Sequence, residues 1–344
     1  MRKIGADMSA QSQTPAQLLR RLSLVMRASR ALSVAAQLGV ADILASGEIA
    51  AAAGVDGATL RRLLRALVAF GVFEEEAPDR FRLNPAGELL RRDIAGSQRA
   101  GVLFTAGDMR WQLWLDLLEC VRTGQAAVER AFGKTLFERN AQNTEESELF
   151  NQAMASYSAA LSAPIVAAYD FGSFGCVADI GGGTGRLLAD ILVANPIARG
   201  VLFDLPNVVA AAPPLLAASG VAERCEVVAG SFFDDVPDGA DAYVLRAVIH
   251  DWDDARAAAI LSNCRRAMTS AGTLVIAERV MPEKAEQGRA EDAYLLDLEM
   301  LVNTPGGRER TEAEFQAILR TAGFGPARVI TTAAPVSILD ARPA

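Results

Sequence analysis

His250 is the only histidine in the chain, and its setting suits acid–base chemistry. It stands in the segment Arg246-Ala-Val-Ile-His-Asp-Trp252, between a strand-like run and a helical one. An imidazole titrates at about pH 6.5, so it can accept a proton from a hydroxyl group near neutral pH. A lone histidine is more often structural, so its place in the fold must decide. A metal site built from several histidines is excluded.

A glycine-rich loop forms a second candidate site in the run Val177-Ala-Asp-Ile-Gly-Gly-Gly-Thr-Gly185. Glycines let the backbone approach a ligand closely, and the helical run that follows offers free N–H groups at its start. A nicotinamide dinucleotide fingerprint needs a glycine three positions after Gly183, where this chain has Arg186. The spacing favours a ligand without a pyrophosphate, although a tight strand–helix turn alone gives the same pattern. The next strand-like run ends in Asp204, placed to hold ribose hydroxyls, and this favours the ligand.

The elements that must position these residues alternate between strand and helix from residue 175 onward. This alternation predicts an α/β fold with a mostly parallel sheet covered by helices on both faces. Ligands bind at the carboxyl ends of such strands, so His250, the glycine loop and Asp204 are predicted on one edge. The expected strands are residues 176–180, 200–204, 225–229, 242–246 and 273–279, with a closing pair at 327–332 and 336–340. The expected helices are residues 185–194, 206–219, 254–268 and 312–322.

The first part of the chain has a different pattern. Apolar residues recur at helical spacing over residues 15–45, and further helices are expected over 49–53 and 59–70. Two short strand-like runs follow at 72–75 and 80–83. This order predicts a winged-helix domain. Helices expected at 111–120 and 147–169 connect it to the second part, so the predicted divisions are residues 15–110, 111–170 and 171–344.

Composition narrows the functional classes. The 344 residues are 51% hydrophobic, and the formal net charge is −8. An acidic chain is a poor match for a general nucleic-acid or anionic-membrane surface, so no nucleic-acid or membrane partner is expected. The four cysteines are scattered without a CxxC pair, which indicates free thiols in a reducing compartment. No signal peptide or run of about 18 apolar residues is evident, so we expect a cytoplasmic protein.

Several motifs together resemble one family, the plant and bacterial small-molecule O-methyltransferases of the caffeate and acetylserotonin type. The resemblance extends over about residues 15–340. Its most specific parts are the runs 177–185, Phe203-Asp-Leu-Pro206, His250-Asp-Trp252 and Gly306-Gly-Arg-Glu-Arg-Thr311, with Glu314-Phe315 and Ala322-Gly-Phe324. It implies a Rossmann-like methyltransferase domain and an N-terminal winged-helix domain that forms a homodimer.

The resemblance implies S-adenosylmethionine as the cofactor. Gly181 and Gly183 would line its methionine and ribose portions, Asp204 would bind the ribose hydroxyls, and Trp252 would stack near the adenine. Arg246 aligns with a lysine of the family that contacts the cofactor. Ser231 aligns with an aspartate that contacts the adenosine, so a charged contact is lost there. The implied cofactor-binding set is Asp179, Gly181, Gly183, Asp204, Leu205, Ser231, Phe232, Arg246 and Trp252.

The resemblance also implies a mechanism and an acceptor. His250 would act as general base, flanked by Glu278 and Glu309, for methylation of a hydroxyl, expected to be phenolic, on an aromatic small molecule. The sulfonium methyl is already activated, so no metal is expected. The implied acceptor residues are Phe150, Met154, Tyr157, Asp251, Met300 and Asn303, with Trp111 or Trp114.

Two alternatives remain at this point. One keeps the fold and cofactor but performs decarboxylation or hydroxylation, and His250, Glu278 and Glu309 weigh against it. The other is a cofactor-sensing winged-helix regulator that binds DNA. Arginines at 61, 62 and 65 support it, while the net charge of −8 opposes it. One departure from the family is the segment 44–49, which is short for this domain.

Overall fold

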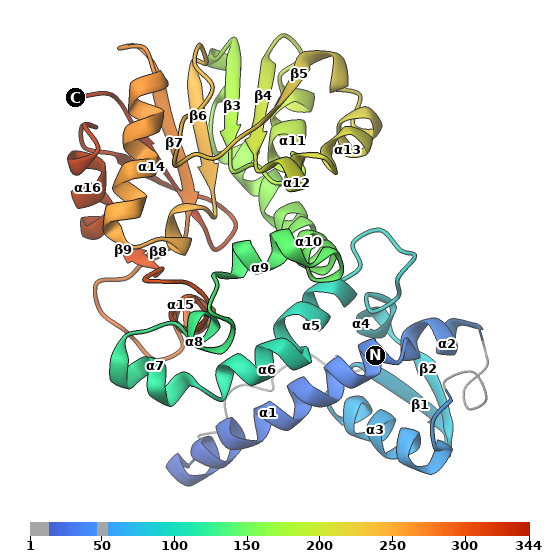
Figure 1. Cartoon of the computed structure of the whole chain (residues 1–344). Helices are drawn as coiled ribbons and strands as arrows, with labels where there is room; N and C mark the ends of the chain where they lie inside the picture. The colour runs from blue at the N-terminus through green and yellow to red at the C-terminus, as the bar shows by residue number, and fades with distance from the viewer. Residues whose placement is uncertain (1–13, 47–53) are drawn as a thin grey trace, which may run out of the picture. The chain divides into compact units, whose positions relative to one another are not determined.

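The computed structural model describes residues 14–46 and 54–344, and the chain divides into two compact units, Met1–Asp108 and Met109–Ala344. The first unit has the helix–helix–helix–hairpin order of a winged helix (Figure 1). Its elements are α1 Pro15–Gln37, α2 Val40–Ser46, α3 Gly57–Ala69, β1 Phe73–Ala77, β2 Arg80–Leu83, α4 Pro85–Glu88 and α5 Arg99–Ala106.

The apolar run over residues 15–45, which Gly39 punctuates in the sequence, forms two helices. The run 15–45 is broken between α1 and α2 at Gly39, whose φ of +66° is left-handed and interrupts helical geometry. The helix expected over 49–53 lies outside the described residues, as does part of the segment 44–49. Helix α3 begins after Asp56, whose side chain accepts a hydrogen bond from the N–H of Thr59 at 2.8 Å.

Two of the three arginines that supported the DNA-binding alternative, Arg61 and Arg65, face acidic side chains of the same unit. Arg61 pairs with Asp79 at 2.9 Å, and Arg65 pairs with Glu75 at 2.9 Å. Both arginines therefore have their charge neutralised locally, which weakens the case for phosphate binding by this helix.

The second unit is built on a seven-stranded sheet of order β10-β11-β7-β6-β3-β4-β5 (Figure 1). Strands β7, β6, β3, β4 and β5 are parallel, and β11 runs antiparallel to β7 and to β10. The strands are β3 Cys176–Ile180, β4 Arg199–Asp204, β5 Cys225–Ala229, β6 Ala242–Arg246, β7 Thr273–Glu278, β10 Arg328–Thr331 and β11 Ser337–Ala341. The predicted α/β class with a mostly parallel sheet is confirmed.

Helices cover both faces of this sheet, and alternate strand residues supply the two cores. Ile180, Leu245 and Ile276 pack with α14 and α16 on one face. Val177 and Val244 pack with α10, α11 and α13 on the other face, as the period of two requires. These helices are α10 Thr144–Ala168, α11 Arg186–Ala194, α13 Ala212–Ala218, α14 Asp254–Ala267 and α16 Glu312–Thr321.

Of the remaining helices in the second unit, α6 to α9 precede β3, α12 follows β4, and α15 lies between β8 and β9. They are α6 Asp108–Trp114, α7 Leu117–Thr123, α8 Ala127–Phe132, α9 Leu136–Gln142, α12 Pro206–Val209 and α15 Glu291–Asn303, and a short pair joins β8 Val280–Met281 to β9 Arg310–Thr311. Two expected helices are wrong as single elements, because 111–120 is divided between α6 and α7, and 206–219 between α12 and α13. The segment 111–170 belongs to the second unit.

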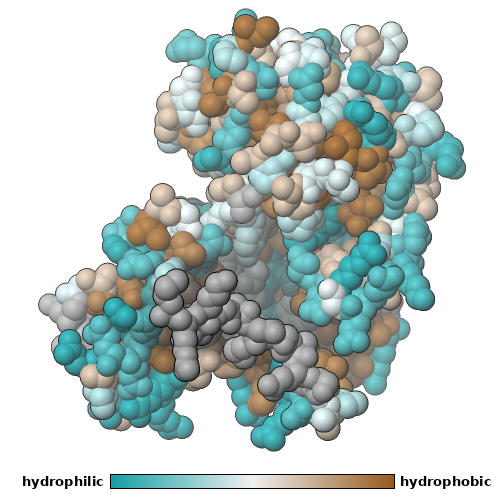
Figure 2. Space-filling view, turned by 180° about the vertical axis from the view of Figure 1, so that it is seen from behind, coloured by the Kyte–Doolittle hydropathy of each residue, from teal (hydrophilic) through white to brown (hydrophobic). Residues whose placement is uncertain are grey.

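Among the described residues, no single helix is long and apolar enough to cross a membrane. Helices α1 and α2 together have the length and the apolar composition of a membrane span, but the chain bends by 55° between them. Figure 2 shows one face of the molecule, where apolar residues occur in separate patches among hydrophilic ones.

Candidate functional site

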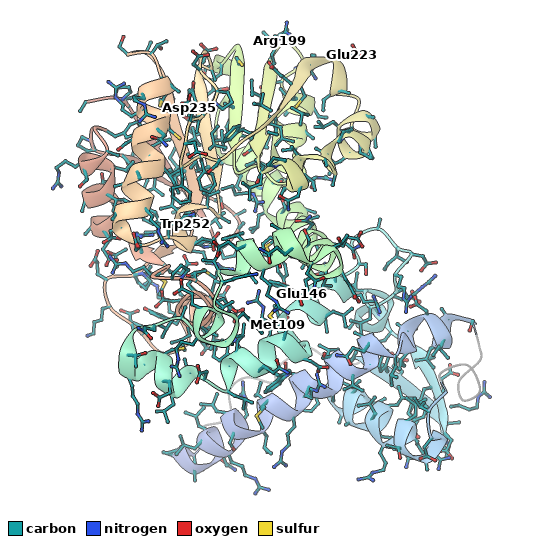
Figure 3. The ribbon with its side chains drawn as sticks, in the orientation of Figure 1. Met109, Glu146, Arg199, Glu223, Asp235 and Trp252 are labelled. Atoms are coloured by element: carbon teal, nitrogen blue, oxygen red, sulfur yellow. The ribbon has the colours of Figure 1, made fainter. Side chains whose placement is uncertain are left out.

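The candidate site lies at the carboxyl ends of β3, β4, β6 and β7. The sheet order reverses between β3 and β6, and open α/β sheets bind ligands at this kind of switch point. Figure 3 shows Trp252 at this edge, whereas Arg199 and Glu223 lie at the opposite edge. The loops that carry the glycines and the histidine therefore meet at one end of the sheet.

The loop after β3 is built from glycines that its geometry requires. Gly181, Gly183 and Gly185 have φ values of +70°, +63° and +83°, a region that other residues rarely adopt. A side chain on Gly182 would place its Cβ 2.6 Å from Leu202. In contrast, a Cβ on Gly183 would meet nothing within 4 Å, so the loop is open at this position.

Asp204 closes this loop from the neighbouring strand. One carboxylate oxygen accepts a hydrogen bond from the N–H of Gly183 at 2.8 Å, and the other accepts from the N–H of Leu205 at 2.7 Å. Burial raises the pKa of Asp204, and these two hydrogen bonds lower it in part. The carboxylate is thereby held at the mouth of the glycine loop with remaining lone pairs available for hydroxyl groups.

Asp179 is a buried carboxylate that the protein does not fully satisfy, and the partly buried Arg246 lies near it. The Oδ2 atom of Asp179 is buried without a hydrogen-bond partner. Burial raises the pKa of Asp179 to about 7, although the nearby Arg246 opposes the rise. Burial likewise lowers the pKa of Arg246, against the effect of Asp179 and Glu278. Unsatisfied buried groups are rare in native proteins, so Asp179, with the guanidinium of Arg246 nearby, fits a ligand that carries both ammonium and carboxylate groups.

Trp252 lies within a group of aromatic rings. Its ring stacks on Phe137 with centroids 5.6 Å apart and meets Phe233 and Phe232 edge-on at 4.7 and 6.0 Å. The indole Nε1 is buried and has no hydrogen-bond partner. Phe137 was not predicted from the sequence, because its contact with Trp252 joins segments far apart in the chain. The Ser231 hydroxyl accepts a hydrogen bond from the N–H of Phe233 at 3.2 Å, and it keeps its own hydrogen to donate.

His250 is surrounded by three carboxylates. Its Nδ1 lies 2.9 Å from Glu309 Oε1 and 3.5 Å from Glu278 Oε2, and the two glutamate side chains are almost fully buried. The Nδ1–H group donates to Glu309, which leaves Nε2 as the nitrogen that can accept a proton. Asp251 Oδ1 is 3.6 Å from Nε2, beyond hydrogen-bond distance.

The carboxylates govern the protonation of this histidine. Burial alone would lower the pKa of His250, but Glu278, Asp251 and Glu309 together raise it to about 10. Burial raises the pKa of Asp251 to about 6, with His250 opposing the rise. Burial also raises the pKa of Glu278. The carboxylates therefore favour the protonated form of His250.

A buried arginine that the sequence did not reveal lies beside the expected acceptor residues. Arg110 on α6 is 3% exposed, pairs with Glu299 at 3.3 Å, and donates a hydrogen bond to Asn303. Trp114 donates from Nε1 to the same Glu299 at 2.6 Å. Burial lowers the pKa of Arg110, against the charges of Glu299, Tyr157 and Asp251. The sequence gives little indication that Arg110 is functional, because a single arginine in a helix is ordinarily exposed to solvent.

The other expected acceptor residues come from two helices. Phe150, Met154 and Tyr157 lie on α10 at spacings of four and three, which places them on one face of that helix. All three are partly buried, and Phe150 meets Phe137 edge-on at 6.2 Å. Met300 is buried on α15, one turn before Asn303.

One group of side chains at this edge also has the composition of a metal site. The nitrogen of His250 and the carboxylate oxygens of Glu278 and Glu309 all lie within 4.8 Å of one another. The hydrogen bond between His250 and Glu309 explains why these side chains lie close together without an ion.

Comparisons with known proteins agree with this geometry. Residues 114–325 match the model of the O-methyltransferase domain, and residues 20–93 match that of the O-methyltransferase dimerisation domain. A phenazine O-methyltransferase of Lysobacter antibioticus is 42% identical over 320 residues, which are 92% of each chain. An O-demethylpuromycin-O-methyltransferase of Streptomyces alboniger is 39% identical over 324 residues, 92% of this chain and 86% of that one.

Solved structures give the same result in three dimensions. The crystal structure of LaPhzM has a TM-score of 0.91 at 41% identity and covers 96% of this chain and 99% of its own. Human N-acetylserotonin methyltransferase in complex with S-adenosylmethionine has a TM-score of 0.87 at 25% identity, over 98% of this chain and 99% of its own. The chain therefore belongs to the S-adenosylmethionine-dependent O-methyltransferases of the caffeate and acetylserotonin type, with an N-terminal dimerisation domain.

Proposed function

We propose that this O-methyltransferase methylates a phenolic hydroxyl of an aromatic small molecule, with His250 as general base. The observation that carries the proposal is the environment of the imidazole. Glu309 accepts from Nδ1–H at 2.9 Å and Glu278 lies close by, so the tautomer with a free Nε2 is favoured when the ring is neutral. When bound, S-adenosylmethionine supplies a methyl group already activated on a sulfonium.

The residues of the cofactor edge suit that ligand. Asp204 offers carboxylate lone pairs to ribose hydroxyls, and the open side of Gly183 leaves room for them. The buried Asp179 and the partly buried Arg246 offer groups of opposite charge to an amino-acid moiety. Trp252 and Phe232 offer aromatic surface to a purine, and Ser231 offers a hydroxyl.

The raised pKa of His250 matches the group from which it must take a proton. A free phenol has a pKa of about 10, and the pKa of His250 is also about 10. Proton transfer between groups of equal pKa costs almost no free energy. The bound pair can therefore exist as phenol with imidazole or as phenolate with imidazolium, and either form places electron density on the acceptor oxygen.

The acceptor class follows from the side chains that α6, α10 and α15 supply and from the relatives. Phe150, Tyr157, Met300 and Arg110 offer flat apolar surface with a buried cation, which suits an aromatic ring with polar substituents. One relative is named a 2,7-dihydroxy-5-methyl-1-naphthoate 7-O-methyltransferase and is 37% identical over 90% of this chain. Another, at 39% identity over 91%, is named an 8-amino-8-demethylriboflavin N,N-dimethyltransferase, so aryl amines belong among the acceptors to be tested.

The proposed enzyme is a homodimer that needs no metal. The dimerisation domain covers residues 20–93. In the N-terminal half of α1, the side chains of Leu19, Leu22 and Met26 are 68%, 60% and 55% exposed. Exposed apolar faces of this kind mark interaction sites. Light scattering at micromolar concentration should give twice the chain mass, and a monomer would refute the dimer. The four cysteines are free, which supports a cytoplasmic location.

The test is a methyl-transfer assay. Purified protein is incubated with S-adenosylmethionine and panels of hydroxylated phenazines, naphthoates and quinones, with matched amines in parallel, and S-adenosylhomocysteine is measured. We expect turnover with at least one hydroxyl acceptor and methylation on oxygen by mass spectrometry. Turnover confined to amines would overturn the phenolic assignment.

A further inference from the structure

Arg310 is a fully buried cation that the methyl-transfer mechanism does not use. Its side chain is 0% exposed, and it lies on the short strand β9 directly after Glu309. Burying a guanidinium is costly unless its donors are satisfied and its charge is paired. Asp254 supplies the paired charge, because its Oδ1 accepts from Nε at 3.0 Å and from Nη2 at 2.8 Å.

The other donors of Arg310 hold the backbone on either side of His250. Nη1 donates to the carbonyl of Ile249 at 3.0 Å, and Nη2 donates to the carbonyl of Trp252 at 2.7 Å. One rigid guanidinium thus joins the start of the histidine turn to its end. A guanidinium has five donors in a planar fork, so lysine cannot reproduce this set.

Neighbouring groups hold the same turn from other directions. The Oε1 atom of Glu278 accepts from the N–H groups of Val248 and Ile249 at 2.9 and 2.8 Å. The N–H of Arg308 donates to the carbonyl of His250 at 2.8 Å. Gly307 permits this approach, since a Cβ there would lie 2.6 Å from the His250 carbonyl oxygen.

We propose that Arg310 is a positioning residue for His250: by bridging the carbonyls of Ile249 and Trp252, it fixes the imidazole against Glu309 and Glu278. The proposal rests on the proposed function of His250, but its main readout does not require that function. The groups that face His250 are Glu278 from β7, Glu309 from the segment before β9 and Asp251 beside it, with Arg110 near Asp251. Movement of the ring relative to these groups, or a change in its burial, changes its protonation.

Because the chain contains one histidine, isotope-labelled histidine in tag-free protein gives imidazole signals from His250 alone. The experiment compares Arg310→Lys with the parent in three measurements: NMR titration of His250, kcat and KM for S-adenosylmethionine, and Tm. We expect the His250 pKa to fall from about 10 toward the ordinary value of about 6.5. We also expect kcat to fall by roughly 10- to 100-fold, since a misplacement of about 1 Å can cost that much.

Arg224→Lys is the matched control. Arg224 also clamps backbone carbonyls, donating to Ala198 at 2.6 Å and to Leu192 at 2.8 Å. It follows Glu223, which Figure 3 places at the edge of the sheet opposite Trp252. This variant should lower Tm while leaving the His250 titration and kcat unchanged.

If Arg310→Lys does not fold, Asp254→Asn is measured in its place. Asp254→Asn removes the paired charge from an exposed partner and leaves the guanidinium in place, so smaller changes in the same direction are expected. Unchanged His250 titration and kcat in whichever variant folds would overturn the positioning role. If His250→Ala retains full turnover while Arg310→Lys still shifts the titration, the base assignment fails and the positioning role stands.

Discussion

The turn that carries His250 and the cofactor edge beside it differ in how their polar groups are satisfied. In the turn, Glu278, Arg308 and Arg310 bond to its backbone, and Glu309 bonds to its side chain. On the cofactor edge, Asp179 Oδ2 and Trp252 Nε1 are buried without hydrogen-bond partners, and beside His250 only the second oxygen of Glu309, Oε2, is in the same position among the groups that hold the turn. The backbone of the turn is held by protein groups, while the cofactor edge retains groups that a ligand can satisfy.

This difference separates two kinds of function. A proton acceptor must be held in one geometry through each turnover, so its supports are built into the fold. A ligand-binding edge gains affinity when the ligand satisfies groups that the protein leaves unsatisfied. Changes in the turn should therefore alter the rate of chemistry, and changes in the cofactor edge should alter affinity.

The largest effect is expected for His250→Ala. Turnover should fall by roughly 10²- to 10⁴-fold, the range for a positioned general base. The affinity for S-adenosylhomocysteine, measured by calorimetry, should stay near that of the parent. A variant that loses affinity but keeps its turnover at saturation would show that the histidine only packs against the cofactor. The turn would then affect binding and not the rate of chemistry.

Glu309→Gln should have the next largest effect and should alter the pH dependence. His250 must be neutral to accept a proton, and its pKa of about 10 means that kcat/KM rises with pH well above 6.5. Removing one of the carboxylates that raise this pKa lowers it, so the rising limb should move toward lower pH. At its optimum pH the variant should be less impaired than His250→Ala, because the base remains. A rise in kcat/KM at the same pH in the variant and the parent would contradict the role of Glu309.

Asp204→Ala tests the other side of the comparison. Loss of hydrogen bonds to a charged acceptor should weaken binding of S-adenosylmethionine by about 1–3 kcal/mol, with turnover at saturation largely retained. Asp190→Ala is the control, because Asp190 pairs with Arg186 at 3.0 Å on α11 and is not a predicted ligand contact. S-Adenosylhomocysteine should raise the Tm of the parent and NAD should not. Equal affinity in the two variants would remove Asp204 from the ribose site.

The smallest effect is expected on metal removal. His250, Glu278 and Glu309 are close enough to hold an ion, but the proposed mechanism uses them as base and supports. Dialysis against EDTA should leave kcat within experimental error of the untreated enzyme, and added Mg²⁺ should not raise it. Activity lost on chelation and restored by a divalent cation would show that the site works through a metal.

The methyltransferase sheet was largely predictable from local sequence. Strands β3, β5 and β6 begin and end where the pattern predicts, because each is a short apolar run bounded by glycine, proline or charged residues. The continuous helix expected over 206–219 was wrong, because Pro213 and Pro214 stand in the first turn of α13 and the helix begins anew there. Gly39, which punctuates the first apolar run in the sequence, takes a left-handed conformation between α1 and α2.

The sequence by itself determined which loops carry the chemistry, since the ends of parallel strands meet at one edge whatever the packing. The motifs also assigned the family. Tertiary structure alone decided what surrounds those loops: Arg110 beside Asn303, Phe137 on Trp252, and Arg310 across the histidine turn. It also decided the protonation of His250. That property depends on burial and on distances to carboxylates from separate segments, and neither quantity is encoded in local residue pattern.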